Sequence, residues 1–69
     1  KMEEYINLRA NNGKIEAEYQ GKIKSIDEIC NCLDSGKIPK NIKVRWSGIY
    51  PIKVYSALKE AEQKITQRI

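Results

Sequence analysis

Two short segments with alternating side chains, separated by a turn sequence, limit the possible folds of this chain more than any other feature. Apolar side chains occupy every second residue from Tyr5 to Ala10, and the alternation returns from Lys14 to Tyr19. This period places the apolar side chains on one face of a half-buried strand. Asn11-Asn12-Gly13 lies between the segments, and Asn and Gly tolerate the positive φ angles of a tight turn. The sequence therefore predicts a β-hairpin, with Gln20-Gly21 ending its second strand.

A capping-box sequence predicts a short helix after the hairpin. In Ser25-Ile26-Asp27-Glu28 the serine hydroxyl can accept from the Glu28 amide, while the Glu28 carboxylate reaches back to the cap. The apolar residues that follow recur at helical spacing, at Ile26, Ile29, Cys30 and Leu33. Asp34-Ser35-Gly36 then supplies a glycine stop.

The C-terminal half contains a third alternating segment and a longer helical pattern. Residues 41–46 place Ile42, Val44 and Trp46 on one face, which predicts a third strand. Pro51 suits the first turn of a helix, because its missing amide would have no partner there. One apolar stripe follows it, and the helix is expected to run close to Ile69; the stripe comprises Val54, Tyr55, Leu58, Ala61 and Ile65.

These elements predict a small α+β fold in the order strand, strand, helix, strand, helix. We expect a three-stranded sheet with both helices packed on one face. The right-handed crossover rule places the third strand beside the first. At 69 residues the chain is expected to form a single domain, residues 1–69.

The residues needed for common catalytic and metal sites are scarce. The chain has no histidine, which removes the commonest general base and metal ligand. Cys30 and Cys32 are separated by one residue, which is too tight a loop for an ordinary disulfide, so both are expected to be free thiols. On a helix they would point about 200° apart and could not bind one metal ion together. Glu16 and Glu18 are expected on the open face of the sheet, opposite or diagonal to Arg9 and near Lys43 and Arg45, where the alternating charges form a cross-strand ladder. The sequence thus predicts a non-enzymatic protein without a cofactor or metal.

The distribution of charge suggests a binding surface. The chain has 13 basic and 9 acidic residues, and none of the acidic ones lies between Asp34 and Glu60. Trp46 and Tyr55 are expected in the core, whereas Tyr50 is the candidate for an exposed stacking residue. We expect nucleic acid, DNA or RNA, to bind along a cationic edge. Its candidate residues are Lys37, Lys40, Lys43, Arg45, Ser47, Gly48, Tyr50 and Lys53.

The alternative is a protein-interaction module or small regulator. It would act through an exposed edge strand or the C-terminal helix, and it could form a homodimer. No apolar run approaches membrane-spanning length. An intracellular, cytoplasmic protein with a nucleic-acid or protein partner and no membrane contact is therefore expected.

Overall fold

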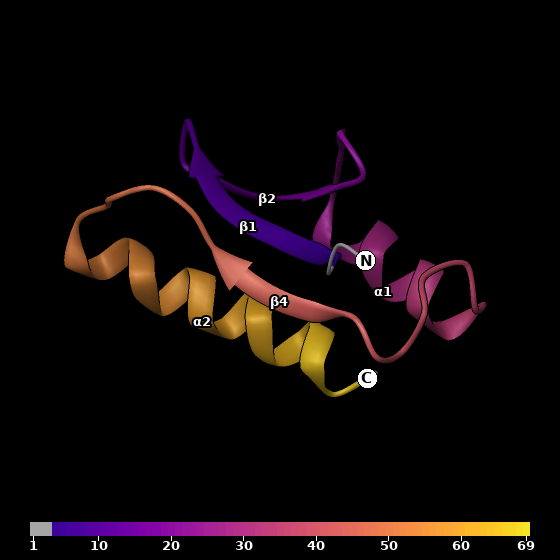
Figure 1. Ribbon diagram of the computed structural model, residues 1–69. Helices are drawn as coiled ribbons and strands as arrows, with labels where there is room; N and C mark the ends of the chain where they lie inside the picture. Colours follow the sequence, from indigo (N-terminus) through magenta and orange to yellow (C-terminus); the bar gives the residue numbers. More distant parts are fainter. Residues whose placement is uncertain (1–3) are drawn as a thin grey trace.

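The computed structural model describes residues 4–69, so residues 1–3 of the predicted domain lie outside the described residues. Figure 1 shows the elements along the chain. The strands are β1 (Tyr5–Asn11), β2 (Lys14–Tyr19), β3 (Lys22–Lys24) and β4 (Lys43–Trp46), and the helices are α1 (Ile26–Asp34) and α2 (Ile52–Thr66). The predicted α+β class is confirmed.

The strands form one mixed sheet in the order β3-β2-β1-β4. β1 pairs antiparallel with β2, and β2 pairs antiparallel with β3. β4 lies parallel to β1, with Tyr5 opposite Lys43 and Leu8 opposite Trp46. The returning strand therefore lies beside the first strand, as the crossover rule predicted.

The prediction of three strands is wrong, because the chain turns back after β2 instead of leaving the sheet. Gln20 and Gly21 have φ angles of +53° and +79°. Two consecutive residues with positive φ form the kind of tight turn that joins antiparallel strands. β3 follows this turn directly and pairs with the end of β2, so the sheet has four strands.

The predicted ends of both helices agree closely with the structure. The Ser25 hydroxyl accepts from the Glu28 amide at 3.1 Å, and the Glu28 carboxylate accepts from the Ser25 amide at 3.2 Å, which forms the expected capping box. Pro51 is the N-cap residue of α2 rather than a residue of its first turn. α2 ends at Thr66, close to the end of the chain.

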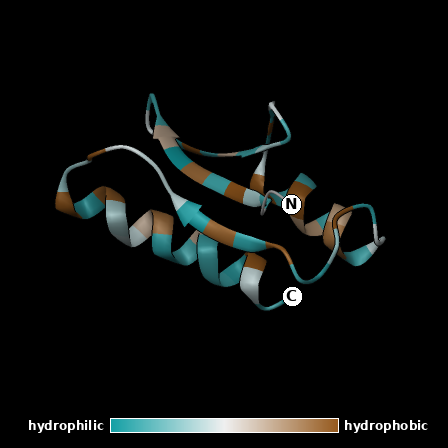
Figure 2. Ribbon diagram, in the orientation of Figure 1, coloured by the Kyte–Doolittle hydropathy of each residue, from teal (hydrophilic) through white to brown (hydrophobic). Residues whose placement is uncertain are grey.

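The core lies between one face of the sheet and the two helices. Figure 2 shows hydrophobic and hydrophilic residues alternating along β1, as expected for a strand with one buried face. Both helices pack on this face, because buried residues of α1 and α2 join those of the strands in one cluster. The cluster contains Ile6, Leu8, Ala17, Tyr19, Ile29, Cys30, Leu33, Ile38, Ile42, Leu58, Ala61 and Ile65.

The predicted core aromatics lie at the border of this cluster. Trp46 and Tyr55 are half-buried and pack against the core. Their rings stack with centroids 5.7 Å apart and planes inclined by 18°. Ile38, which lies in the loop after α1 and was not predicted as a core residue, is only 1% exposed.

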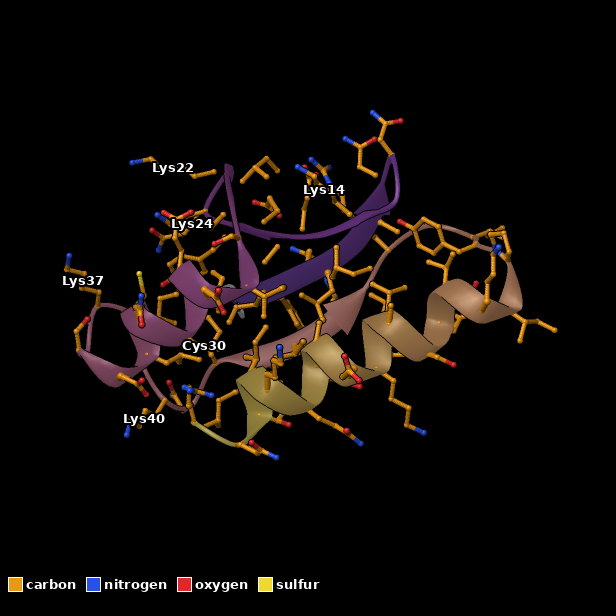
Figure 3. The ribbon with its side chains drawn as sticks, turned by 180° about the vertical axis from the view of Figure 1, so that it is seen from behind. Lys14, Lys22, Lys24, Cys30, Lys37 and Lys40 are labelled. Atoms are coloured by element: carbon orange, nitrogen blue, oxygen red, sulfur yellow. The ribbon has the colours of Figure 1, made fainter. Side chains whose placement is uncertain are left out.

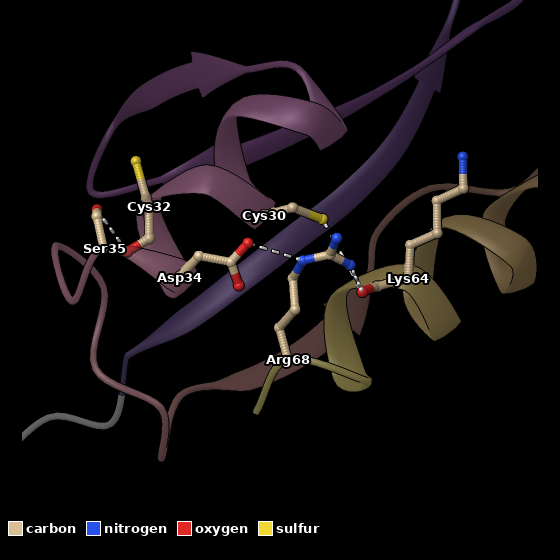
Figure 4. A network of polar contacts seen from close by, with 6 residues as sticks. All are labelled: Cys30, Cys32, Asp34, Ser35, Lys64 and Arg68. Atoms are coloured by element: carbon tan, nitrogen blue, oxygen red, sulfur yellow. Dashed lines mark hydrogen bonds and ion pairs between the residues drawn. The ribbon is translucent and has the colours of Figure 1, made fainter.

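The C-terminal ends of the two helices are joined by polar contacts (Figure 4). Arg68 Nε lies 3.3 Å from Asp34 Oδ2, and Arg68 Nη1 donates to the Lys64 carbonyl at 3.0 Å. The buried Cys30 thiol donates to the same carbonyl at 3.9 Å. Cys32 points away from Cys30 on the other side of α1, and both are free thiols.

Candidate nucleic-acid interface

The open face of the sheet is covered by cross-strand polar contacts. Arg9 Nε lies 3.5 Å from Glu16 Oε1, between residues that are paired in the register. Asn7 Nδ2 donates to Glu18 Oε1 at 2.9 Å. The expected pairing of acidic with basic residues on this face is therefore confirmed for Arg9 and Glu16.

Arg45, one of the predicted cationic-edge residues, is engaged on this same face. Its Nε donates to Asn7 Oδ1 at 2.5 Å, and its guanidinium lies 4.0 Å from the centre of the Tyr5 ring. Asn7 thus links Arg45 to Glu18, and the carboxylate of Glu18 lies in the same network. A phosphate approaching Arg45 would have to displace these contacts near a carboxylate, which disfavours binding there.

In the loop between β4 and α2, the predicted site residues Ser47, Gly48 and Tyr50 stabilise the conformation of the loop itself. Tyr50 is half-buried rather than exposed, and its hydroxyl donates to the Ser47 carbonyl at 2.7 Å. The Tyr50 amide donates to the Tyr55 hydroxyl at 3.1 Å, and the two rings pack edge to face with centroids 6.0 Å apart. Gly48 has a φ angle of +99°, and a Cβ added there would lie 2.5 Å from the Tyr50 hydroxyl oxygen. The loop therefore holds a fixed shape in which Tyr50 packs against Tyr55 and is not a fully exposed stacking residue.

The predicted edge residues do not converge on one site. Lys37 and Lys40 lie at the end of the molecule that holds α1, whereas α2, which carries Lys53, begins at the opposite end (Figures 1 and 3). Lys43 and Arg45 lie between them on β4. The predicted site residues are thus spread along the length of the molecule. Lys37 and Lys40 at one end and Lys53 at the other lie away from the acidic residues of the sheet face, whereas Arg45 lies among them.

A different group of lysines gathers at the α1 end. Figure 3 shows Lys22 and Lys24 of β3 on the same side of the molecule as Lys37 and Lys40. We call these four residues the lysine end. Three of them line an open pocket of about 170 Å³, together with Tyr19, Gln20, Cys32 and Ile38.

The fold fixes this arrangement through neighbouring residues. Lys22 pairs with Tyr19 and Lys24 with Ala17, so the two lysines project to the helix side of the edge strand β3. Lys37 is held by its neighbour Ile38, whose side chain is buried and whose amide donates to the Cys32 carbonyl at 3.1 Å. Lys22 and Lys24 are therefore placed by the pairing of β3 with β2, and Lys37 by the burial of its neighbour Ile38.

The wall of the pocket contains a buried tyrosine. The Tyr19 hydroxyl donates to Glu4 Oε1 at 3.2 Å, and Gln20 Nε2 donates to Glu4 Oε2 at 3.2 Å. Burial raises the pKa of Tyr19 above 10.0, and the hydrogen bond to Glu4 and its negative charge raise it further. Tyr19 thus remains neutral beside the lysines at physiological pH.

Lys22 and Lys24 are not among the predicted site residues, because Gln20-Gly21 is expected to end the second strand and no strand is predicted directly after it. The sequence signal for β3 is weak: the turn residues Gln20-Gly21 are followed by Lys22-Ile23-Lys24, in which a single apolar residue lies between two lysines. Lys22 and Lys24 occupy the face where a strand pattern requires apolar residues. This inversion is tolerated because β3 lies at the edge of the sheet, where Lys22 is exposed and Lys24 half-buried.

Comparisons with protein-family models, with curated proteins and with solved structures gave no match for this chain. Neither of the helices in residues 4–69 is long and apolar enough to cross a membrane. Across the same residues, no three Cys, Asp or Glu side chains are grouped so that they could hold a metal ion.

Proposed function

We propose that this protein is a non-enzymatic nucleic-acid-binding domain whose contact surface is the lysine end. The observation that supports this proposal is the gathering of Lys22, Lys24, Lys37 and Lys40 from two separate segments at one end of the molecule. Within residues 4–69, none of these four ammonium groups forms an ion pair with an acidic side chain. Four such charges can replace the counterions that surround a phosphate backbone.

The state of the arginines supports binding that does not depend on base sequence. Each of the three arginines is already engaged, Arg9 with Glu16, Arg45 with Asn7 and Tyr5, and Arg68 with Asp34. Bidentate arginine contacts are the commonest means of reading guanine. Lysine acts mainly as a point charge towards phosphate. The lysine end therefore suits backbone contacts, and we propose that it binds nucleic acid of any sequence.

The protein-interaction alternative receives less support at the places first considered. Both edge strands contain lysine, at Lys22 and Lys24 in β3 and at Lys43 in β4. Lysines on edge strands disfavour pairing with the strand of another molecule. The apolar stripe of α2 is used inside the protein, since Leu58, Ala61 and Ile65 are buried.

The salt dependence of binding tests the proposal. We would measure fluorescence anisotropy with labelled 20-nucleotide single-stranded DNA, single-stranded RNA and the matching DNA duplex. For four phosphate contacts, log K against log salt should have a slope of about −3.6 for duplex and about −2.8 for single strands. The duplex affinity should then fall about 150-fold between 50 and 200 mM salt. No binding at low salt would exclude this function.

A matched pair of variants tests the location. K22Q/K24Q should reduce the duplex slope to about −1.8, because two of four phosphate contacts are removed. K14Q/K59Q loses the same charge from residues outside the lysine end and should retain the wild-type slope. Equal reductions in both variants would mean that binding follows net charge and not this surface.

Cys32 provides an independent reporter, because it lines the pocket together with Lys22, Lys24 and Lys37. In a C30S variant, only Cys32 is available to a thiol reagent. Bound DNA should slow its modification at 50 mM salt and lose this effect at high salt. Unchanged reactivity in a fully bound sample would place the nucleic acid elsewhere.

A further inference from the structure

A second concave surface lies at the end of the molecule opposite the lysine end. It is a groove of about 320 Å³ between the β1–β2 hairpin and the first turns of α2. Its walls are largely apolar and are formed by Ala10, Ile15, Val54 and Ala57 together with Tyr50. Lys53 is the one charged residue of its described lining. We call this surface the α2 groove.

Two isoleucines, one in the loop before α2 and one at the start of α2, are unusually exposed. Ile49 is 95% and Ile52 87% exposed, compared with 47% for Ile23 and 45% for Ile69. Each is next in sequence to a residue that lines the groove, Tyr50 and Lys53 respectively. Packing of the domain does not explain these side chains, since they lie almost entirely in solvent.

The loop presents Ile49 and Ile52 in a fixed arrangement. Tyr50, between them, is held by Ser47 and Tyr55 through hydrogen bonds of 2.7 and 3.1 Å. The Val54 amide donates to the Pro51 carbonyl at 2.9 Å and closes the first turn of α2. A surface that is ordered before binding loses less conformational entropy when a partner docks. An apolar groove with exposed aliphatic side chains close to it in the chain offers apolar surface that a partner could cover.

The charge around the α2 groove favours a partner with carboxylates. No acidic residue lies between Asp34 and Glu60 in the sequence, which includes the whole loop and the start of α2. The first turn of α2 contains no acidic residue, and Pro51 provides no side-chain cap for the helix. The positive end of the helix dipole therefore adds to the charge of Lys53.

We propose that the α2 groove docks an acidic amphipathic segment of a partner protein. One large apolar side chain of the segment enters the groove, its neighbours cover Ile49 and Ile52, and a carboxylate pairs with Lys53. A second copy of this chain is a poorer occupant, because the net charge of +4 opposes self-association. Nucleic acid is disfavoured because Ile49 and Ile52 provide no aromatic stacking surface. The α2 groove and the lysine end share no residue, so docking at the groove does not require nucleic-acid binding.

A peptide-display selection tests this inference directly. Random 14-residue peptides would be selected on the immobilised wild-type protein, with soluble I49S/I52S present in excess to remove peptides that bind elsewhere. The expected peptides carry apolar residues at positions i, i+3 or i+4, and i+7, with Asp or Glu between them. No enrichment, or enriched peptides without net negative charge, would overturn the proposal.

A second experiment reverses the charges of the selected peptide and of Lys53 and measures the binding affinity. The best selected peptide and a version with Lys in place of each Asp and Glu would be titrated by NMR. Wild type should bind the acidic peptide at least tenfold more tightly, with shifts at Gly13, Ile52 and Ala57. K53E should weaken the acidic peptide at least tenfold, whereas K59E and I23S serve as controls and should change binding less than twofold. Equal binding to K53E and wild type would refute the role of Lys53.

Vesicles distinguish a lipid surface from a protein partner. The protein would be sedimented with vesicles of phosphatidylcholine containing 30% phosphatidylserine. Binding that requires Ile49 and Ile52 would overturn the proposal in favour of an anionic lipid surface. Absence of such binding, together with an acidic peptide that depends on both isoleucines, would support it.

Discussion

Gly48 offers the most stringent test of how the loop between β4 and α2 is held. Gly48→Ala introduces a Cβ that would lie 2.5 Å from the Tyr50 hydroxyl oxygen and 2.7 Å from its ring carbon Cζ. Tyr50 cannot move freely, because its hydroxyl donates to Ser47 and its ring packs against Tyr55. The substitution must therefore displace a fixed ring or distort the backbone.

The expected cost follows from three contributions. A non-glycine residue with positive φ costs about 1–2 kcal/mol. The displaced Tyr50 loses a hydrogen bond of about 1 kcal/mol and an aromatic contact of about 0.5–1.5 kcal/mol. Because relaxation recovers part of this, we expect Gly48→Ala to lower the free energy of unfolding by about 2–4 kcal/mol.

Urea denaturation followed by Trp46 fluorescence and far-UV circular dichroism would measure this change. Gly36→Ala is the matched control, since Gly36 has a φ angle of +82° but no atom within 4 Å of an added Cβ. It should cost only the backbone contribution of about 1–2 kcal/mol. In a Tyr50→Ala background, Gly48→Ala should likewise cost only that amount. Equal losses for Gly48→Ala in both backgrounds would refute the steric argument.

Three further predictions concern α1 and the wall of the pocket. Ser25→Ala should lower the free energy of unfolding by about 1 kcal/mol through loss of the helix cap, and Ser25→Asp should restore most of it in thermal denaturation. In the folded protein Cys32 should react with a thiol reagent much faster than Cys30, because only Cys30 is buried; equal rates at low denaturant would contradict its burial. The raised pKa of Tyr19 means that the unfolded chain releases this proton near pH 10 while the folded protein retains it. The contribution of Tyr19 to stability is therefore fully present below pH 10 and is lost as the pH rises from 10 through the pKa of Tyr19 in the folded protein. Tyr19→Phe should lack this decrease in urea titrations between pH 9 and 11. Glu4→Gln should lower the pH at which Tyr19 ionises, followed by phenolate absorbance, towards that of a free tyrosine.

Elements with several repeats of a pattern, or with a local hydrogen-bonding signature, could be predicted from the sequence. The first hairpin follows from two alternating segments and from Asn12 and Gly13, whose φ angles are +52° and +77°. The start of α1 follows from its capping box, which involves only residues three apart. Such signals act over a few residues, so they do not depend on the rest of the fold.

β3 could not be recognised in the same way. Three residues give one alternation, and its apolar residue Ile23 faces solvent while Lys22 and Lys24 face the helix side. Lysines can occupy the helix side of β3 only because β3 lies at the edge of the sheet. The position of a strand within the sheet cannot be recognised from three residues of sequence.

The residues of the lysine end could not be predicted for the same reason, because their grouping depends on tertiary structure. In the sequence, Arg45 and Lys37 each count as one positive charge. In the folded structure Arg45 contacts Asn7 and Tyr5, so its guanidinium is already engaged. Lys22 and Lys37 are separated along the chain by the whole of α1, so no local pattern joins them. Predicting which charges are available therefore requires the register of the sheet.

The position of β1 in the sheet also determines the order in which the domain is expected to fold. β1, β2 and β3 are joined by tight turns, so their pairing closes only short loops. β1 also pairs with β4, whose residues follow it by 38 positions in the parallel register, as for Tyr5 and Lys43. Closing that loop carries a larger entropic cost before any contact is gained. The β1–β4 pairing should thus limit the folding rate.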